Sequence, residues 1–223
     1  EEPKTIKVVG GLGANIISKI KLINKKNLET KLCTKFKHKI IIVNFYPEVS
    51  SIRKSINTLK NIFRVISAID KIHCIFTLPS HDIGNNKFEN LIKKFVKFKK
   101  DYFFYKNLGQ TKFLSLLKIS TILIGNSSSG VLEMPSFGKY SINIGDRQKG
   151  RIQTNSVINC SSNGKSISEA LLKLYSPEFQ SNLKTVTNPY GDGDTSKKIK
   201  QIVLEAFSKN KINLKKEFYD LKF

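Results

Sequence analysis

The chain has 223 residues, of which 39% are hydrophobic and 25% charged, and its formal net charge is +22 at pH 7. This length supports one domain with a sizeable core. No apolar run approaches the roughly 20 residues of a membrane-spanning helix, so we expect no membrane partner.

The positive charge has two interpretations. A nucleic-acid partner would explain it, but only four of the 39 basic residues are arginines, and the lysines are spread over the whole chain beside many Asn and Ile residues. Such a composition is typical of AT-rich codon use. Arginines and aromatic residues do not interleave in the way that suits single-stranded nucleic acid. We therefore attribute the positive charge mainly to codon bias. The charge would also give some help in binding anionic ligands, and a nucleic-acid partner is the less favoured alternative.

Apolar runs alternate with amphipathic segments along the chain, and their lengths and periods predict strands and helices. The predicted elements, in chain order, are a strand at Ile6–Val9, helices at Ala14–Leu22 and Lys26–Thr34, a strand at Lys39–Phe45, a helix from Ser50 or Ser51 to Ile69, a strand at Ile72–Leu78, a helix at Lys87–Phe98, a strand at Tyr102–Tyr105, a helix at Thr111–Ile119, a strand at Thr121–Gly125, a helix from the following serines to Phe137, strands at Tyr140–Ile144 and Ser156–Asn159, and helices at Ile167–Leu174 and Thr195–Phe207.

Repeated β–α units of this size predict an α/β fold with a doubly wound, parallel, Rossmann-like sheet. Lys39–Phe45 is nearly all apolar, as expected of a strand that is buried on both faces. We assign residues 1–208 to this domain. The Lys-rich tail, 209–223, is either a further amphipathic helix that docks on a partner or a frayed end.

Ligands of open α/β sheets bind outside the carboxyl ends of the strands. Four segments of this chain follow predicted strands: the turn after Val9, Tyr46–Ser50, Pro79–Gly84 and Gly125–Glu133. The predicted topology brings them to one edge, where they can share a pocket.

The stretch Gly125–Arg151 carries the strongest chemical signal. Its strand, glycine turn and serine-started helix form the usual place for a phosphate, because unpaired N–H groups and the helix dipole favour an anion. A second Gly-rich turn, 145–151, supplies two of the four arginines, and the guanidinium fork fits phosphate oxygens. The alternative is that the serines only cap a helix. The spacing matches neither a P-loop nor a dinucleotide fingerprint.

The three cysteines, Cys33, Cys74 and Cys160, are widely spaced, without a C-x-x-C pair. This favours reduced thiols and a cytoplasmic location, and it makes a structural metal improbable. The charged start, Glu1–Thr5, is unlike a secretory signal peptide.

Residues 125–151, GNSSSGVLEMPSFGKYSINIGDRQKGR, resemble the signature of the hydrolysing UDP-N-acetylglucosamine 2-epimerases of sialic and legionaminic acid pathways. Three more segments match in the same order. Residues 9–16, VGGLGANI, are similar to the family's G-x-L-G-x-D-N-I. Residues 44–50, NFYPEVS, stand where the family has His-Pro-Val-Thr, and residues 188–194, NPYGDGD, resemble its N-P-Y-G-D-G.

The resemblance implies the C-terminal, UDP-binding half of a two-domain GT-B-type fold. An N-terminal domain, in cis or in trans, would then supply acidic residues for proton chemistry. The implied reaction eliminates UDP from UDP-N-acetylglucosamine or a related UDP-diacetamido sugar, and water then gives N-acetylmannosamine or a related 2-epimer for nonulosonic acid synthesis. No metal or other cofactor is implied. A catalytically incomplete UDP-sugar-binding fragment and a GT-B glycosyltransferase half remain alternative functions. A homo-oligomer is a possible assembly for any of them.

The same resemblance assigns roles to residues of the Gly125–Arg151 stretch. Ser127 and Ser128 would donate hydrogen bonds to the diphosphate, and Ser129 would add a backbone N–H. Glu133 would accept from the ribose hydroxyls, although a first-turn carboxylate is also favoured by the helix dipole alone. Arg147 would be catalytic, because it stabilises the charge on UDP as the C1–O bond breaks.

The remaining implied UDP-binding residues lie outside that stretch. Leu108 and Phe113 belong to a loop that would contact uracil, with core packing as the equal alternative for Phe113; Gly13 would lie at the mouth of the site. Asp82 and Ser80 match P-N-x-D-x-G, with Ser80 in place of the family's Asn.

Two further residues differ from the family pattern at positions near the sugar. Ala14 stands where the family has an acidic residue, so a charge contact is lost. Tyr46 is a predicted catalytic residue, but it replaces the family's His. A tyrosine hydroxyl can donate a hydrogen bond, yet its ordinary pKa near 10 makes it a poor base at neutral pH.

Overall fold

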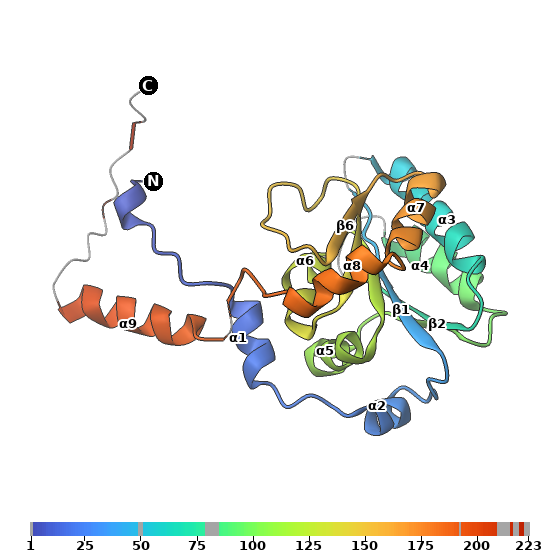
Figure 1. Ribbon diagram of the computed structural model, residues 1–223, viewed down its shortest axis with the longest axis horizontal. Coiled ribbons are helices and arrows are strands. Elements are labelled where there is room, and N and C mark those ends of the chain that lie inside the picture. The colour runs from blue at the N-terminus through green and yellow to red at the C-terminus, as the bar shows by residue number, and fades with distance from the viewer. Residues whose placement is uncertain are drawn as a thin grey trace.

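The computed structural model describes residues 2–48, 51–78, 85–191, 193–208, 215 and 219–220. Its centre is one six-stranded sheet in the order β3-β2-β1-β4-β5-β6, and every neighbouring pair is parallel (Figure 1). The strands are β1 Lys39–Asn44, β2 Ile72–Thr77, β3 Tyr102–Tyr105, β4 Ile122–Gly125, β5 Tyr140–Ile144 and β6 Val157–Cys160.

Helices connect these strands and cover the sheet on both faces. The α-helices are α1 Leu12–Lys19, α2 Lys25–Lys31, α3 Ile52–Ser67, α4 Asn85–Val96, α5 Gly109–Ile119, α6 Ser129–Leu132, α7 Gly164–Lys173, α8 Pro177–Asn182 and α9 Thr195–Ser208. Short 3-10 helices are η1 Pro3–Thr5, η3 Met134–Phe137 and η4 Leu183–Thr185. Every helix among the described residues is too short or too polar to cross a membrane.

Strand β1 shows how the sheet is stabilised. Ile41 and Val43 face a core formed with α3, α4 and α7, whereas Ile40 and Ile42 face a second core formed with α2, α5 and η3. Side chains alternate across a strand, so a continuous apolar run is what two buried faces require. The predicted α/β, doubly wound, parallel fold is therefore confirmed.

Most predicted elements are present within a few residues of their expected bounds, but the strand at Ile6–Val9 is wrong. This segment is irregular, and Val8 is 95% exposed. An apolar run forms a strand only where a neighbouring strand can pair with it. The turn after Val9 consequently does not follow a strand of the sheet; the Gly11 N–H donates a hydrogen bond to the Tyr190 carbonyl oxygen, at 2.6 Å.

The predicted helix from the serines to Phe137 is also corrected. It is one turn of α-helix, α6, followed by the 3-10 helix η3. Pro135 has no N–H to continue the α-helical ladder, and Gly138, at φ 59°, ends the segment. Helix α8 lies in a stretch for which no element was predicted.

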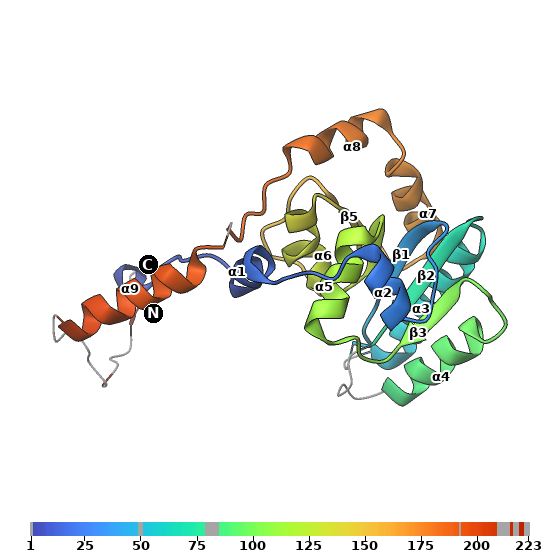
Figure 2. The same ribbon diagram turned by 90° about the horizontal axis from the view of Figure 1, so that it is seen from below.

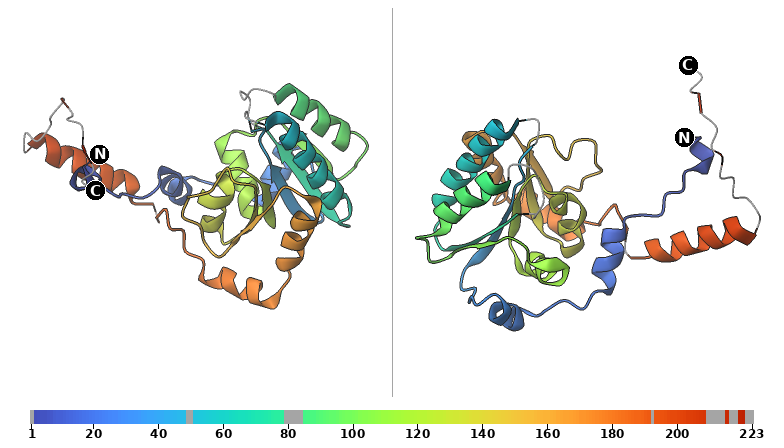
Figure 3. Two further views of the ribbon diagram at one scale, coloured as in Figure 1. Left: turned by 90° about the horizontal axis from the view of Figure 1, so that it is seen from above. Right: turned by 180° about the vertical axis from the view of Figure 1, so that it is seen from behind.

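Helices α1 and α9 pack on each other, and α9 extends away from the sheet (Figures 2 and 3). The Asn15 Oδ1 atom accepts hydrogen bonds from the Ser196 backbone N–H, at 3.3 Å, and from the Ser196 hydroxyl, at 3.0 Å. The predicted tail, 209–223, lies mostly outside the described residues.

Candidate functional site

The loop after β4 approaches the end of β1 more closely than a side chain would allow. Gly125 has φ 149°, and a Cβ atom at this position would collide with the Asn44 carbonyl oxygen. Only glycine adopts this conformation readily. The glycine therefore brings the serine loop against the segment that contains Tyr46.

Asn126 joins the two loops. Its fully buried side chain accepts a hydrogen bond from the Tyr46 N–H, at 2.7 Å, and donates one to the Tyr46 carbonyl oxygen, at 3.0 Å. Its own carbonyl oxygen accepts hydrogen bonds from Gln148, at 2.8 Å, and from Arg147, at 3.3 Å. Asn126 thus holds the backbone of Tyr46 and the side chain of Arg147, the two predicted catalytic residues.

Arg147 lies over the aromatic ring of Tyr46, with 4.9 Å between the guanidinium carbon and the ring centroid. Stacking on an aromatic face holds a guanidinium group in a fixed orientation. The side chain of Arg147 is exposed, and no salt bridge is formed by Arg147 within the described part of the chain. The cation is therefore held in place and available to an anion.

Burial raises the pKa of the Tyr46 phenol above its ordinary value of 10.0. Hydrogen bonds from Ser127 and Asn44 and the charge of Arg147 act in the opposite direction, and Glu133 raises the pKa further. The net direction is upward, so Tyr46 is neutral at pH 7. It can donate a hydrogen bond to an anion, but it cannot supply a positive charge.

Ser127 and Ser128 lie in the turn between β4 and α6, and Ser129 is the first residue of α6; the sequence predicts a phosphate site here. The Ser127 hydroxyl accepts a hydrogen bond from the Ser129 N–H at 3.2 Å, and Ser128 is the N-cap residue of α6. Because α6 is a single turn, its dipole is weak. The groups that could hold an anion here are therefore mainly the hydroxyl groups and Arg147.

Glu133 follows α6 and lies near this turn. Burial raises the pKa of its carboxyl group, and a hydrogen bond with Ser129 partly offsets that effect. Its Oε2 atom is buried and has no hydrogen-bond partner among the described residues. A buried carboxylate oxygen without a partner is costly, and a ligand hydroxyl would satisfy it.

A pocket of about 280 Å³ opens beside Tyr46 at the carboxyl ends of β1, β2 and β3. Leu108 and Phe113 line it, as expected for the loop that the resemblance places at uracil. Asn44 and Thr77 are also among its lining residues. The pocket thus combines an apolar wall with polar side chains, as ligand sites commonly do.

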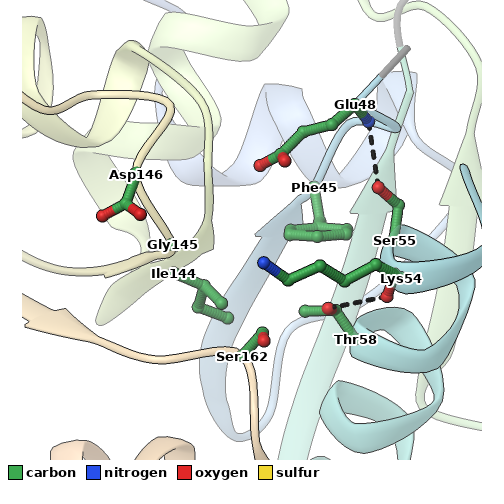
Figure 4. Close-up of a pocket in the computed structure, with 9 residues that line it drawn as sticks. All are labelled: Phe45, Glu48, Lys54, Ser55, Thr58, Ile144, Gly145, Asp146 and Ser162. Atoms are coloured by element: carbon green, nitrogen blue, oxygen red, sulfur yellow. Dashed lines mark hydrogen bonds between the residues drawn. The ribbon is translucent and has the colours of Figure 1, made fainter. Parts of the chain in front are cut away.

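A smaller pocket of about 60 Å³ lies on the other side of the Gly145–Asp146 turn. Figure 4 shows the Glu48 carboxylate and the Lys54 amine pointing into it. The Glu48 N–H donates a hydrogen bond to the Ser55 hydroxyl at 3.0 Å, which attaches this loop to α3. The pocket has room for a few water molecules only.

The structure therefore brings together seven predicted site residues: Tyr46, Leu108, Phe113, Ser127, Ser129, Glu133 and Arg147, with Ser128 in the same turn. Gly13 lies in α1, which packs on α9. Asp82 and Ser80 lie outside the described residues.

Sequence reasoning assigned no role to Asn44, Thr77, Asn126 and Gln148. Asn126 stands inside the motif GNSSSG, directly after the glycine that ends a predicted strand, and this position was the available signal. Asn44 and Thr77 are the last residues of β1 and β2, and polar residues that end apolar strands could have indicated them. The described residues contain no group of three metal-binding side chains.

Comparison with known proteins identifies the family that the sequence motifs resemble. The chain matches the profile of the UDP-N-acetylglucosamine 2-epimerase family over residues 1–204. It is 34% identical to the GDP/UDP-N,N'-diacetylbacillosamine 2-epimerase (hydrolyzing) of Campylobacter jejuni over 222 residues, which are 99% of this chain and 57% of that protein. It is 32% identical to polysialic acid biosynthesis protein P7 of Escherichia coli over 99% of this chain and 56% of that protein.

Among solved structures, the S. aureus MnaA–UDP co-structure has a TM-score of 0.74 at 20% identity, over 98% of this chain and 59% of that one. This likeness shows a shared fold. The chain spans a little more than half the length of the curated relatives it matches. Its profile match and its identity to these relatives show that the chain belongs to the UDP-N-acetylglucosamine 2-epimerase family.

Proposed function

We propose that this chain forms the UDP-binding part of a hydrolysing 2-epimerase. The substrate is UDP-N-acetylglucosamine or a UDP-diacetamido sugar, and the products are UDP and N-acetylmannosamine or a related 2-epimer. Two relatives carry the name of a hydrolysing diacetylbacillosamine 2-epimerase, one of C. jejuni and one of Legionella pneumophila, which supports the second sugar.

One observation carries the proposal: the exposed guanidinium group of Arg147 is stacked on Tyr46 next to the serine turn and the 280 Å³ pocket. In this arrangement the diphosphate lies between Arg147 and the Ser127–Ser129 turn. Glu133 accepts from the ribose, and the base enters the pocket beside Phe113.

Arg147 contributes most when the C1–O bond breaks, because negative charge then accumulates on the leaving UDP. A positioned cation stabilises such developing charge. The neutral Tyr46 phenol donates a hydrogen bond to the same oxygens. Removal of the C2 proton needs a base. We assign this base to the portion of the relatives' sequences that this chain does not span.

Tyr46 also favours a second candidate function, because the family has His at this position. In this alternative the protein binds a UDP-sugar but does not convert it. Both candidates need the nucleotide site. They differ in whether N-acetylmannosamine or its diacetamido counterpart is formed once the complete protein is assayed.

Calorimetric titration with UDP tests the shared requirement. We expect Arg147→Ala to weaken UDP binding by about 1.5–3 kcal/mol, the range for hydrogen bonds to charged groups. Arg64→Ala removes an exposed arginine of α3 and serves as the control, with unchanged affinity. Equal affinity of Arg147→Ala and the wild type would refute the phosphate role.

A further inference from the structure

The edge of the sheet opposite the nucleotide site is strongly basic. In a parallel sheet, the residues that precede the strands lie together at the amino-terminal edge. Lysines precede or begin the three neighbouring strands β1, β2 and β3; they are Lys37, Lys39, Lys71, Lys97 and Lys100. All five are exposed. We call this surface the amino-terminal edge.

These lysines are not neutralised by neighbouring carboxylates. None of the five forms a salt bridge within the described ranges. The acidic residues nearby are Asp70, which precedes β2, Asp101, which faces the buried His73, and Glu29, which accepts a hydrogen bond from the Phe36 N–H and lies 3.9 Å from the Lys25 Nζ atom. Lys97 directly follows α4, and its N–H donates a hydrogen bond to the Lys93 carbonyl oxygen, so the preference of helix C-termini for basic residues explains this one lysine. The other four lie farther from a helix end.

The same edge exposes large apolar side chains. Phe98, between Lys97 and Lys99, is 88% exposed, and the Lys97 Nζ atom lies 5.2 Å from its ring centroid. At the C-terminal end of α7 and just beyond it, Leu172 is 71% and Tyr175 62% exposed. Exposed apolar side chains that form a contiguous patch mark protein or membrane interaction sites.

Charge and apolar surface are contiguous here. An apolar cavity of about 270 Å³ opens between the ends of α3 and α7 and the beginnings of β1, β2 and β4. Lys39, Leu172 and Tyr175 are among its lining residues, and the Lys39 Nζ atom lies 5.3 Å from the Tyr175 ring centroid. A cation thus stands at the rim of an open apolar recess.

We propose that the amino-terminal edge docks on an anionic phospholipid bilayer. Lysines near a membrane surface are attracted to acidic head groups, and aromatic and aliphatic side chains enter the interfacial layer. Nucleic acid would satisfy the lysines but would leave the apolar recess and Phe98 unused. Docking at this edge keeps the carboxyl edge, with Arg147, open to solution.

A peripheral contact with a membrane needs no spanning segment, so the lack of an apolar run of about 20 residues does not exclude a membrane partner. The docking face lies opposite the nucleotide site, and docking there does not depend on the proposed enzymatic function.

Co-sedimentation with lipid vesicles tests the proposal directly. The 223-residue chain is mixed with vesicles of phosphatidylcholine alone or with about one-third phosphatidylglycerol, in about 0.1 M salt, where surface charges still act over about 10 Å. We expect binding to the anionic vesicles only. Lys97→Gln with Lys100→Gln is expected to weaken it by about fivefold for each lysine.

Two further variants separate this edge from the general charge of the chain. Phe98→Ser removes an exposed ring without opening the core, and we expect it to weaken binding while the thermal unfolding midpoint stays unchanged. Lys197→Gln, Lys198→Gln and Lys200→Gln together remove three exposed charges from α9, and binding is expected to persist.

The proposal is overturned by absence of binding to anionic vesicles, or by an equal loss of binding in the α9 variant. It is also overturned if Phe98→Ser leaves vesicle binding unchanged while a single-stranded oligonucleotide displaces the vesicles, because that result identifies nucleic acid as the ligand.

Discussion

At the residue scale, Tyr46 connects the two parts of the nucleotide site. Its backbone is held by Asn126, its ring supports Arg147, and its side chain lines the 280 Å³ pocket. A histidine at this position could become a cation near neutral pH, whereas the raised pKa of Tyr46 keeps it neutral. The positive charge of the site therefore comes from Arg147 and from Lys106, which lines the pocket and pairs with Glu89.

His73 shows a different use of a titratable residue. It is buried at the start of β2, its Nε2 atom accepts a hydrogen bond from the Lys37 N–H at 2.8 Å, and Nδ1 lies 3.4 Å from Asp101. An imidazolium would have to carry a proton on Nε2, which the Lys37 N–H opposes. His73 therefore stabilises the structure as a neutral imidazole.

This geometry predicts a pH dependence of stability. Burial lowers the pKa of His73 below its ordinary value of 6.5; Asp101 and Glu29 act upward, and His38 and Lys25 downward. Between the folded pKa and about 6.5, the unfolded chain binds more protons, so the free energy of unfolding falls as the pH falls. The slope from this one group is at most about 1.4 kcal/mol per pH unit.

Urea unfolding at pH 7.5 and at pH 5.5 measures the effect for the wild type and for His73→Gln, whose side-chain oxygen can still accept from Lys37. We expect the wild type to lose more stability than the variant between the two values. An identical loss would assign the acid sensitivity to other groups.

At the scale of elements, the close approach of β4 to β1 positions the site. Replacing Gly125 by Ala places a Cβ atom against the Asn44 carbonyl oxygen at a φ of 149°. Strain of this backbone region and forced displacement each cost about 1–3 kcal/mol. We expect a loss of about 3 kcal/mol in the free energy of unfolding, together with weaker UDP binding.

Gly13→Ala is the matched control in the same measurement. A Cβ atom at Gly13 meets nothing within 4 Å, and the residue lies in α1. Alanine is favoured over glycine in helices by about 0.5–1 kcal/mol, so the control should be neutral or more stable. If both variants behaved alike, the contact between β4 and β1 would not determine the geometry of the site.

The elements also show what the sequence could and could not predict. Strand β1 was predictable because burial on two faces demands an apolar run, whereas Ile6–Val9 shows the same kind of run without a partner strand. The motif residues at 125–151 were predictable because they are close together in the sequence. Asn44 and Thr77 were missed because their proximity to Phe113 follows from strand order, which no local pattern records.

At the scale of the whole molecule, charge is the dominant feature. The chain has 39 Lys and Arg residues but only 17 Asp and Glu residues. Most lysines can therefore have no acidic partner, whatever the fold. Like charges repel more strongly in the compact state than in the expanded chain, and a large net charge consequently destabilises folding.

This imbalance predicts that salt stabilises the protein. At about 0.05 M salt the repulsion extends over more than 10 Å, whereas at about 0.5 M it is screened within a few ångströms. We expect the urea midpoint to rise between these two conditions at pH 7.5. Lys198→Glu with Lys200→Glu lowers the net charge on the exposed side of α9 and should show a smaller rise. A midpoint that falls with salt would mean that the few ion pairs, such as Glu89 with Lys93 and Lys106, outweigh the repulsion among the lysines.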